Sequence, residues 1–354
     1  MIKPKMLKKG DKVAIVSLSR GLLGESFIAH EVPIGIKRLE GYGLEVVFMP
    51  NSCKGMKYTL EHPEARAKDL KDAFLDKSIK MIMCAIGGDD TYKTLPYLLE
   101  DSEFKQIVLE NPKIFIGFSD STINHLMFYK LGLTTYYGPA FLTDLCELDK
   151  EMLPYTKYWF DKLFNNEENL EIKSSPIWYS DREDYSSKQI GTPRKANKET
   201  NGYEVLNGRG KVKGKLLGGC IESIYKAIYN DKNEIYTKYD MFPINDNLKN
   251  NILFLETSDG KSAPEELKKM LLEMQELGIF NLVKGLIIGK PIDEVYYEEY
   301  KTVYEEMFKD SNLPILYNIN FGHSVPRGII PYGIEAELDL DNKKITLLES
   351  FFIK

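Results

Sequence analysis

The sequence predicts an α/β protein of two domains, in which a parallel-sheet domain of the Rossmann or flavodoxin type precedes a domain with several β-strands. Three observations support this fold class. At 354 residues the chain is long for a single hydrophobic core. Short apolar runs alternate with helical patterns up to about residue 140, which is typical of a parallel sheet with helices on both faces. A polar stretch with little periodicity, 166–210, then precedes the second part.

In the first part, the apolar runs predict strands and the amphipathic patterns between them predict helices. The expected strands are 12–17, 44–49, 81–86, 114–117 and 135–138, and the expected helices are 28–39, 63–74, 92–100 and 123–131. In such a sheet, ligands collect outside the carboxyl ends of the strands. The glycine pair 87–88 and Ser119 each follow a strand, so both are expected at that edge.

The second part mixes strands and helices. The expected strands are 252–255, 285–289, 315–317 and a hairpin over 336–348, and the expected helices are 264–277 and 298–309. We therefore predict an N-terminal domain over 1–165, a linker and substrate loop over 166–210, and a C-terminal domain over 211–354. A polar connection of this length is often functional.

The composition indicates a small-molecule ligand and a cytoplasmic location. The chain has 47 basic and 53 acidic residues, a net charge of −6, and no basic tract, so neither nucleic acid nor an anionic membrane is an expected partner. Its four cysteines are far apart and are expected to be reduced thiols. The N-terminus lacks the apolar segment of a signal peptide, and no run of 18 apolar residues occurs. No cofactor is expected.

Ser119 is the candidate nucleophile. The apolar run 113–116 leads into Gly-Phe-Ser-Asp at 117–120, and a helical pattern follows. A serine at a sharp strand-to-helix turn has an exposed hydroxyl, and the N–H of the next residue can face a developing oxyanion. The alternative is that this segment only caps the helix, since serine and aspartate are common capping residues.

A nucleophilic serine needs a base, and the chain has only four histidines. His30 and His62 are expected to be structural or exposed. His125 lies on the helix that leads away from Ser119 and cannot easily reach back. His323 lies in a loop after an apolar strand, where catalytic groups are often found, although it could instead cap a turn.

The third member of such a set is an acid that orients the imidazole. Glu256 ends the apolar run 251–255, and a carboxylate at the end of a buried strand is costly unless it is paired. The alternatives are that Glu256 belongs to a solvated turn, or that Glu222 has this role.

The segment Gly87-Gly88-Asp89-Asp90 has no phosphate-loop spacing. Two successive glycines permit a tight turn with free N–H groups, enough for a second oxyanion donor. A metal site formed by both aspartates and Asp120 is disfavoured, because such sites usually need more ligands in register, and we expect no bound metal.

Together these motifs resemble those of the LD-carboxypeptidase family of serine peptidases, and within it the microcin C self-immunity branch. The resemblance covers nearly the whole chain, and no single motif decides it. The matching segments occur in the expected order at 10–14, 65–70, 86–88, 117–120, 214–219, 253–256 and 321–323.

The resemblance implies a Ser-Glu-His triad in the crevice between an N-terminal α/β domain and a β-barrel-like C-terminal domain, in a protein that is usually a homodimer. Ser119 would be the nucleophile, His323 the general base and then acid, and Glu256 its orienting partner. The N–H groups of Gly88 and Asp120 would form the oxyanion hole, which leaves the Asp120 side chain free to cap.

The resemblance also implies an amide-type bond next to a free carboxylate as the target. In one branch this bond belongs to an aminoacyl-nucleotide, and in the other to a murein tetrapeptide that loses D-alanine. Isoleucine at position 86 and the long polar insertion favour the first. An aromatic residue of the insertion, Trp178 or Tyr185, would stack on the base. Cys220 replaces the usual asparagine. A non-catalytic protein that binds a small ligand is the remaining alternative.

Overall fold

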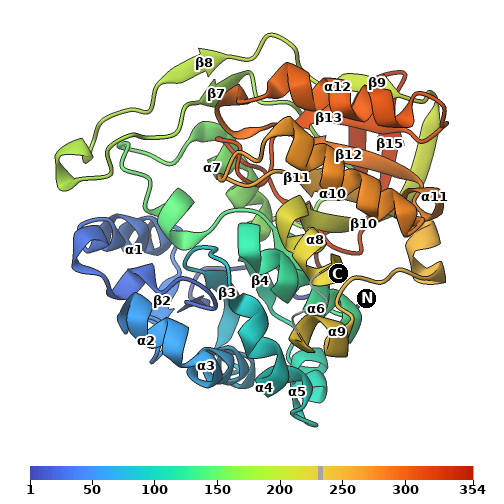
Figure 1. The fold of residues 1–354 in the computed structure, drawn as a ribbon. Helices are drawn as coiled ribbons and strands as arrows, with labels where there is room; N and C mark the ends of the chain where they lie inside the picture. Colours follow the sequence, from blue (N-terminus) through green and yellow to red (C-terminus); the bar gives the residue numbers. More distant parts are fainter. Residues whose placement is uncertain (230–233, 354) are drawn as a thin grey trace.

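The computed structural model describes residues 1–229 and 234–353, so residues 230–233 and 354 of the predicted C-terminal domain lie outside the described residues. The strands form a six-stranded sheet, an eight-stranded sheet and a small two-stranded ribbon, with helices packed around them (Figure 1). This arrangement confirms the predicted fold class, an N-terminal parallel sheet followed by a separate C-terminal α/β part.

The N-terminal sheet has the strand order β14-β5-β4-β3-β1-β2. Its five strands from the N-terminal part run parallel, and β14 pairs antiparallel with β5. The bounds are β1 (Lys12–Val16), β2 (Glu45–Phe48), β3 (Ile79–Cys84), β4 (Ile114–Gly117), β5 (Tyr136–Tyr137) and β14 (Ile330–Pro331). A strand from near the C-terminus therefore completes this sheet.

The two central strands are buried on both faces over Met81–Cys84 of β3 and over the whole of β4, which explains the uninterrupted apolar sequences of these stretches. The helices of this half are α1 (Val32–Gly41), α2 (Gly55–Glu61), α3 (Pro63–Leu75), α4 (Leu95–Leu99), α5 (Phe104–Glu110), α6 (Thr122–Leu131) and α7 (Pro154–Asp161). Helices α2 to α5 form a row along its outer side (Figure 1). The sequence did not predict α2, α5 or α7, each of which has at most eight residues.

The C-terminal sheet has the order β6-β16-β15-β10-β11-β12-β13-β9, with parallel pairing from β10 to β13 and antiparallel strands at both sides. The strands are β6 (Leu170–Ile172), β9 (Glu204–Asn207), β10 (Lys211–Cys220), β11 (Asn251–Glu256), β12 (Gly285–Gly289), β13 (Ile315–Ile319), β15 (Glu335–Asp339) and β16 (Lys344–Leu347).

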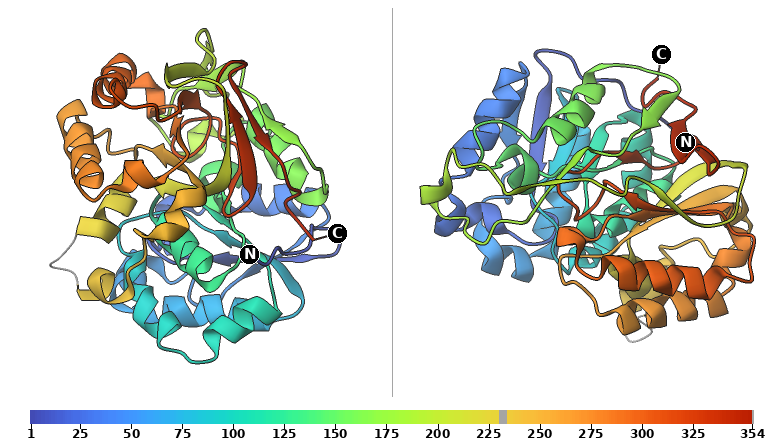
Figure 2. Two further views of the ribbon diagram at one scale, coloured as in Figure 1. Left: turned by 90° about the vertical axis from the view of Figure 1, so that its right-hand side faces the viewer. Right: turned by 90° about the horizontal axis from the view of Figure 1, so that it is seen from above.

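The helices of this half are α8 (Ile221–Tyr229), α9 (Glu234–Tyr239), α10 (Pro264–Glu276), α11 (Ile279–Leu282) and α12 (Tyr297–Phe308). Helices α10 and α12 lie side by side over one face of the sheet (Figures 1 and 2). None of the helices in the described residues is long and apolar enough to cross a membrane.

The segment 173–203, which we call the arm, connects β6 to β9 and carries the ribbon of β7 (Ile177–Tyr179) and β8 (Ala196–Lys198). The arm extends from the C-terminal sheet across to the side of α1 in the N-terminal half (Figures 1 and 2). The chain ends meet on one side of the molecule, where the N–H of Ile353 donates to the carbonyl of Pro4. The predicted boundaries at 165 and 210 stay a prediction.

Candidate active site

Ser119 lies at a strained turn between β4 and α6. Its φ is +64°, a conformation that residues with a side chain rarely adopt, and a single 3₁₀ turn, Ser119–Ser121, leads into the helix. The capping alternative does not describe this turn, because no side chain caps either the 3₁₀ turn or α6. The geometry is that of a nucleophile elbow.

Gly87 allows the segment after β3 to approach this serine closely. A Cβ atom at Gly87 would lie 2.7 Å from Cβ and 2.9 Å from Oγ of Ser119. Two strands that are neighbours in the sheet thus place the predicted glycine pair beside the predicted serine, as expected at the carboxyl edge of a parallel sheet.

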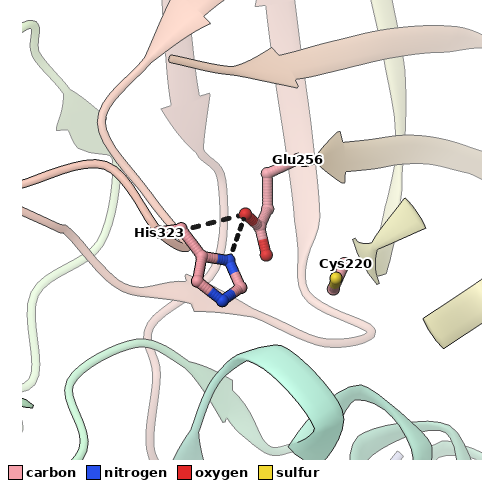
Figure 3. Close-up of side chains that lie close together, drawn as sticks. All are labelled: Cys220, Glu256 and His323. Carbon is pink, nitrogen blue, oxygen red and sulfur yellow. Dashed lines mark hydrogen bonds and ion pairs between the residues drawn. The ribbon is translucent and has the colours of Figure 1, made fainter. Parts of the chain in front are cut away.

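His323 links Ser119 to Glu256. Its Nε2 lies 3.0 Å from Ser119 Oγ. Figure 3 shows the other contact, in which its Nδ1 lies 2.8 Å from Glu256 Oε2. The carboxylate can only accept, so Nδ1 carries the proton and Nε2 accepts the serine hydroxyl proton. The backbone N–H of His323 donates to the same carboxylate oxygen at 3.1 Å. The histidine is 6% exposed and the glutamate 2%.

Gly322 brings the His323 loop against this carboxylate. Its φ is +70°, and a Cβ there would lie 2.3 Å from Cδ of Glu256. A residue with a side chain would therefore separate the histidine from its acid. Ser119, His323 and Glu256 are the three residues predicted from the sequence, and the structure brings all three together.

Tyr137 is a further member of this group that the sequence analysis placed in a strand without a role. Its hydroxyl donates to Glu256 Oε1 at 2.6 Å and accepts from the backbone N–H of Ser119 at 2.9 Å. Burial, together with the negative charge of Glu256, raises the pKa of Tyr137 well above its usual range, so the hydroxyl keeps its proton. One buried side chain therefore joins the carboxylate to the turn that holds the serine.

The pKa of His323 is raised above its usual value of 6.5. Burial alone would lower it, but the charge and hydrogen bond of Glu256 and the nearby charge of Asp259 outweigh burial. Asp259 Oδ1 lies 3.8 Å from Nε2 on a side chain that is 76% exposed. The positive charge of Arg327 acts in the opposite direction.

The backbone N–H groups of Gly88 and Asp120 donate to no protein oxygen within the described ranges, so both are free to bind an oxyanion. The expectation that the Asp120 side chain caps the helix is wrong. Its Oδ2 accepts instead from Ser19 Oγ at 2.6 Å and from the N–H of Thr91 at 2.9 Å. The side chain thereby ties the elbow to the segments that follow β1 and β3.

Cys220 lies beside the triad. Its Sγ and the ligand atoms of Glu256 and His323 all lie within 4.8 Å of one another (Figure 3). Burial, with the charges of Glu222 and Glu256, raises the pKa of the Cys220 thiol well above its usual range, which disfavours the thiolate that a metal would need. The thiol donates to Glu222 Oε2 at 3.1 Å.

Glu222, the competing acid, does not contact His323. Its carboxylate accepts from the N–H and hydroxyl of Ser258 and from the hydroxyl of Ser262, and so holds the loop after β11. Two of the three aspartates of the disfavoured metal site have cationic partners, Asp89 with Arg20 and Asp90 with Arg66.

The other histidines lie away from Ser119 Oγ. His125 is buried between Thr135 Oγ1 and the carbonyl of Gly117, and burial lowers its pKa to about 3. His62 pairs with Glu64 at the surface, and His30 Nε2 lies 2.9 Å from the carbonyl of Tyr185 in the arm.

A cavity of about 640 Å³ opens onto Ser119 and His323. Arm residues, among them Tyr185, form part of its wall, whereas Trp178 does not line it. The indole ring of Trp178 instead packs against Lys290, whose Nζ is 5.2 Å from the ring centroid. Glu31 also lines the cavity, and burial raises its pKa to about 7.

Buried ion pairs hold the arm in place. Glu147 accepts from Arg182 at 2.6 Å and from Arg194 at 2.5 Å, and all three side chains are at most 6% exposed. Arg194 also pairs with Asp181 at 2.9 Å, and Asp181 accepts from the hydroxyl of Tyr185 at 2.6 Å. The part of the cavity wall formed by the arm therefore depends on ion pairs, whereas apolar side chains such as Leu22, Ile86 and Leu142 line other parts of the cavity.

Family models and known proteins match the chain along most of its length. The LD-carboxypeptidase N-terminal domain model matches residues 13–138, and the C-terminal domain model matches 213–338. The microcin C7 self-immunity protein MccF of Escherichia coli is 27% identical over 90% of this chain and 88% of that protein. The arm lies between the two matched ranges.

Solved structures agree. An MccF-like protein from Streptococcus pneumoniae in complex with AMP has a TM-score of 0.89 at 47% identity and covers 95% of this chain and 98% of that one. An MccF-like protein from Bacillus anthracis has a TM-score of 0.80 at 28% identity and covers 98% and 99%.

Proposed function

Because the chain belongs to the LD-carboxypeptidase family, in its MccF-like branch, we propose that it is a serine hydrolase that cleaves an amide-type bond next to a free carboxylate. The proposed substrates are aminoacyl-nucleotide compounds of the microcin C type, which hydrolysis would detoxify. The observation that carries the proposal is the continuous contact from Ser119 Oγ through His323 to Glu256.

In the first step, Ser119 Oγ attacks the carbonyl carbon while His323 Nε2 takes the hydroxyl proton. Glu256 stabilises the resulting imidazolium and holds the ring in the required tautomer. The negative charge that develops on the carbonyl oxygen is bound by the N–H groups of Gly88 and Asp120. Each such donor contributes about 3 kcal/mol to the transition state.

The tetrahedral intermediate then collapses. The bond to the leaving group breaks, His323 gives its proton to that group, and an acyl-enzyme ester remains on Ser119. In the second half, His323 takes a proton from water, the hydroxide attacks the ester, and the acid is released as the serine hydroxyl regains its proton.

Two observations support the substrate class. A relative that is 47% identical is a protein in complex with AMP, and a curated relative is a microcin self-immunity protein. In this chain, Tyr185 lines the cavity from the arm side, where an aromatic ring can stack on a base at about 1–3 kcal/mol. We therefore propose Tyr185 rather than Trp178 as the stacking residue.

The test is hydrolysis of aspartyl-sulfamoyl-adenosine, followed by mass spectrometry of the products. We expect free aspartate and sulfamoyl-adenosine from the wild-type protein, and a fall in kcat of about 10⁴- to 10⁶-fold for Ser119→Ala. A Ser119→Ala protein that keeps full turnover would overturn the proposal.

A second candidate is the release of D-alanine from a murein tetrapeptide, which the description of the matching domain models favours. It requires the same triad and a different leaving group. Parallel incubation with an L,D-tetrapeptide distinguishes the two, because D-alanine would appear only if the peptide is a substrate.

A further inference from the structure

Arg327 has an unusual hydrogen-bonding state for an arginine at a reaction cavity. Among the described residues, six buried side-chain nitrogen or oxygen atoms have no hydrogen-bond partner, and only one of them, Nε of Arg327, belongs to a residue that lines the cavity. An unpartnered N–H on a buried cation is costly, because the group has lost water without replacing it. Such an atom needs an explanation.

The guanidinium is held firmly by its other edge. Nη1 donates to Asp144 Oδ2 at 2.8 Å and to Thr143 Oγ1 at 3.0 Å. Asp144 is itself fixed, since the same oxygen accepts from the N–H of Ala140 and from Thr143. No oxygen of the described residues accepts from Nε or from Nη2. The free edge is the pair of parallel N–H groups that binds a carboxylate in bidentate fashion.

The guanidinium group lies close to the segment that carries Ser119. The guanidinium carbon of Arg327 is 4.0 Å from the centroid of the Phe118 ring, and Phe118 directly precedes Ser119 in the chain. Phe118 also contacts His323, at 5.1 Å between ring centroids. Arg327 is 5% exposed, so its position is set by packing as well as by Asp144.

We propose that Arg327 is the residue that recognises the substrate's free carboxylate, through a bidentate contact with its Nε and Nη2 groups. The inference rests on the proposed function and assigns its acidic specificity to one side chain. The carboxylate can be the side chain of an acidic aminoacyl group or the C-terminus of a peptide, and both present the same planar acceptor. Asp144 and Thr143 are the positioning residues that fix the plane of the guanidinium.

The experiment measures binding in the Ser119→Ala background, so that turnover does not enter. Calorimetry compares aspartyl-sulfamoyl-adenosine with its asparaginyl counterpart, and a tetrapeptide ending in D-alanine with the same peptide ending in D-alaninamide. We expect the carboxylate member of at least one pair to bind about 10- to 100-fold more tightly, and the pair identifies the source of the carboxylate.

Arg327→Met should remove that preference by weakening the carboxylate ligand alone, with the amide ligand within about threefold of its former affinity. Arg327→Lys keeps the charge without the planar edge and should retain only part of the preference. Should the methionine variant not fold, Arg327→Gln replaces it. Arg38→Met is the matched control, because this half-buried guanidinium donates to the carbonyls of residues 145, 147 and 149 outside the cavity.

The outcomes separate this inference from the proposed function. Absence of a carboxylate preference with Arg327 intact, or an unchanged preference in Arg327→Met, overturns the inference even if the wild-type protein hydrolyses the ligands. A preference that depends on Arg327 supports it even if the wild-type protein hydrolyses none of them, in which case only the proposed function fails. A preference that Arg38→Met also abolishes would mean a general loss of fold and overturns the assignment.

Discussion

The site joins two regions that are built in different ways, the triad at the ends of buried strands and the arm that covers the cavity. Ser119 lies just after β4 and Glu256 is the last residue of β11, and the residues of both strands are all buried. The arm has short strands with partly exposed residues, and it is fixed by Glu147 between Arg182 and Arg194.

The difference separates chemistry from specificity. Reacting groups must stay within a fraction of an ångström of their productive geometry, which a packed core provides. A wall of ion pairs and one aromatic ring can change without disturbing that core. We therefore expect substitutions at the triad to lower kcat and substitutions in the arm to raise KM.

After the loss expected for Ser119→Ala, the largest effect should come from Glu256→Gln. The amide presents an N–H or a neutral oxygen to His323 Nδ1, so the imidazole loses both its fixed tautomer and its charge partner, and we expect kcat to fall about 10³- to 10⁴-fold. Steady-state kinetics of the purified variant measures this effect. Glu222→Gln is the comparison, since Glu222 holds the loop after β11 without touching His323. If kcat fell only in the Glu222→Gln variant, the assignment of Glu256 as the acid that orients His323 would be wrong.

Tyr137→Phe should have the next largest effect, because it removes the donor to Glu256 Oε1 and the acceptor for the N–H of Ser119. We expect kcat to fall about 10- to 100-fold and the free energy of unfolding to fall by about 1–3 kcal/mol. Tyr136→Phe is the matched control. Its hydroxyl, equally buried, donates only to the carbonyl of Phe351, so it should cost stability without lowering kcat. Equal kcat losses in both variants would contradict a specific role for Tyr137.

The same contrast explains what the sequence could predict. Buried apolar runs that end near glycines clearly predict where strands end. The sheet edge and the residues Ser119, His323 and Glu256 could therefore be predicted from the sequence. Tyr137 could not, because a buried tyrosine in a strand looks like any core residue until its hydroxyl partners are known. The strands β6 and β9 at the ends of the arm are short outer strands of their sheet, and their pairing is set by the rest of that sheet rather than by local pattern.

Resemblance left the choice between Trp178 and Tyr185 open, since the order of residues in a polar loop does not fix which ring turns inward. The contacts around Arg194 favour Tyr185: its hydroxyl donates to Asp181, which Arg194 holds, while Trp178 packs on Lys290. These contacts join residues up to 112 positions apart, as between the N–H of Asp181 and Asp293, and have no local signature.

Glu147→Gln tests the arm. This substitution breaks two buried ion pairs at once. Loss of one partner of such a pair typically lowers stability by about 3–5 kcal/mol, and here we expect it to destabilise the arm rather than the triad. We expect KM for aspartyl-sulfamoyl-adenosine to rise about 10-fold, kcat to stay within about threefold, and limited proteolysis to cut the arm sooner. Glu167→Gln, which breaks an exposed pair with Lys162, should change none of these. If Glu147→Gln lowered kcat at constant KM, the arm would affect the chemical step, and the proposed division of roles between triad and arm would be wrong.

The smallest effect should come from Asp259→Asn, because Asp259 is a solvent-exposed carboxylate near His323. Its charge helps to raise the pKa of His323, and the base acts only when neutral, so activity falls as the pH drops through that pKa. Removal of the charge should lower the pKa and move the acid limb of kcat/KM to lower pH. Added salt should move the wild-type limb in the same direction, because an exposed charge is screened.

Asp89→Asn is the control for that shift, since Asp89 also lines the cavity, is 70% exposed, and pairs with Arg20 rather than with His323. Its profile should overlay that of the wild-type protein. If both variants shift equally, the general field of the cavity sets the pKa of His323. If neither variant shifts the acid limb at low salt, Glu256 alone raises the pKa of His323. The exposed charges of the cavity wall would then have no effect on the base.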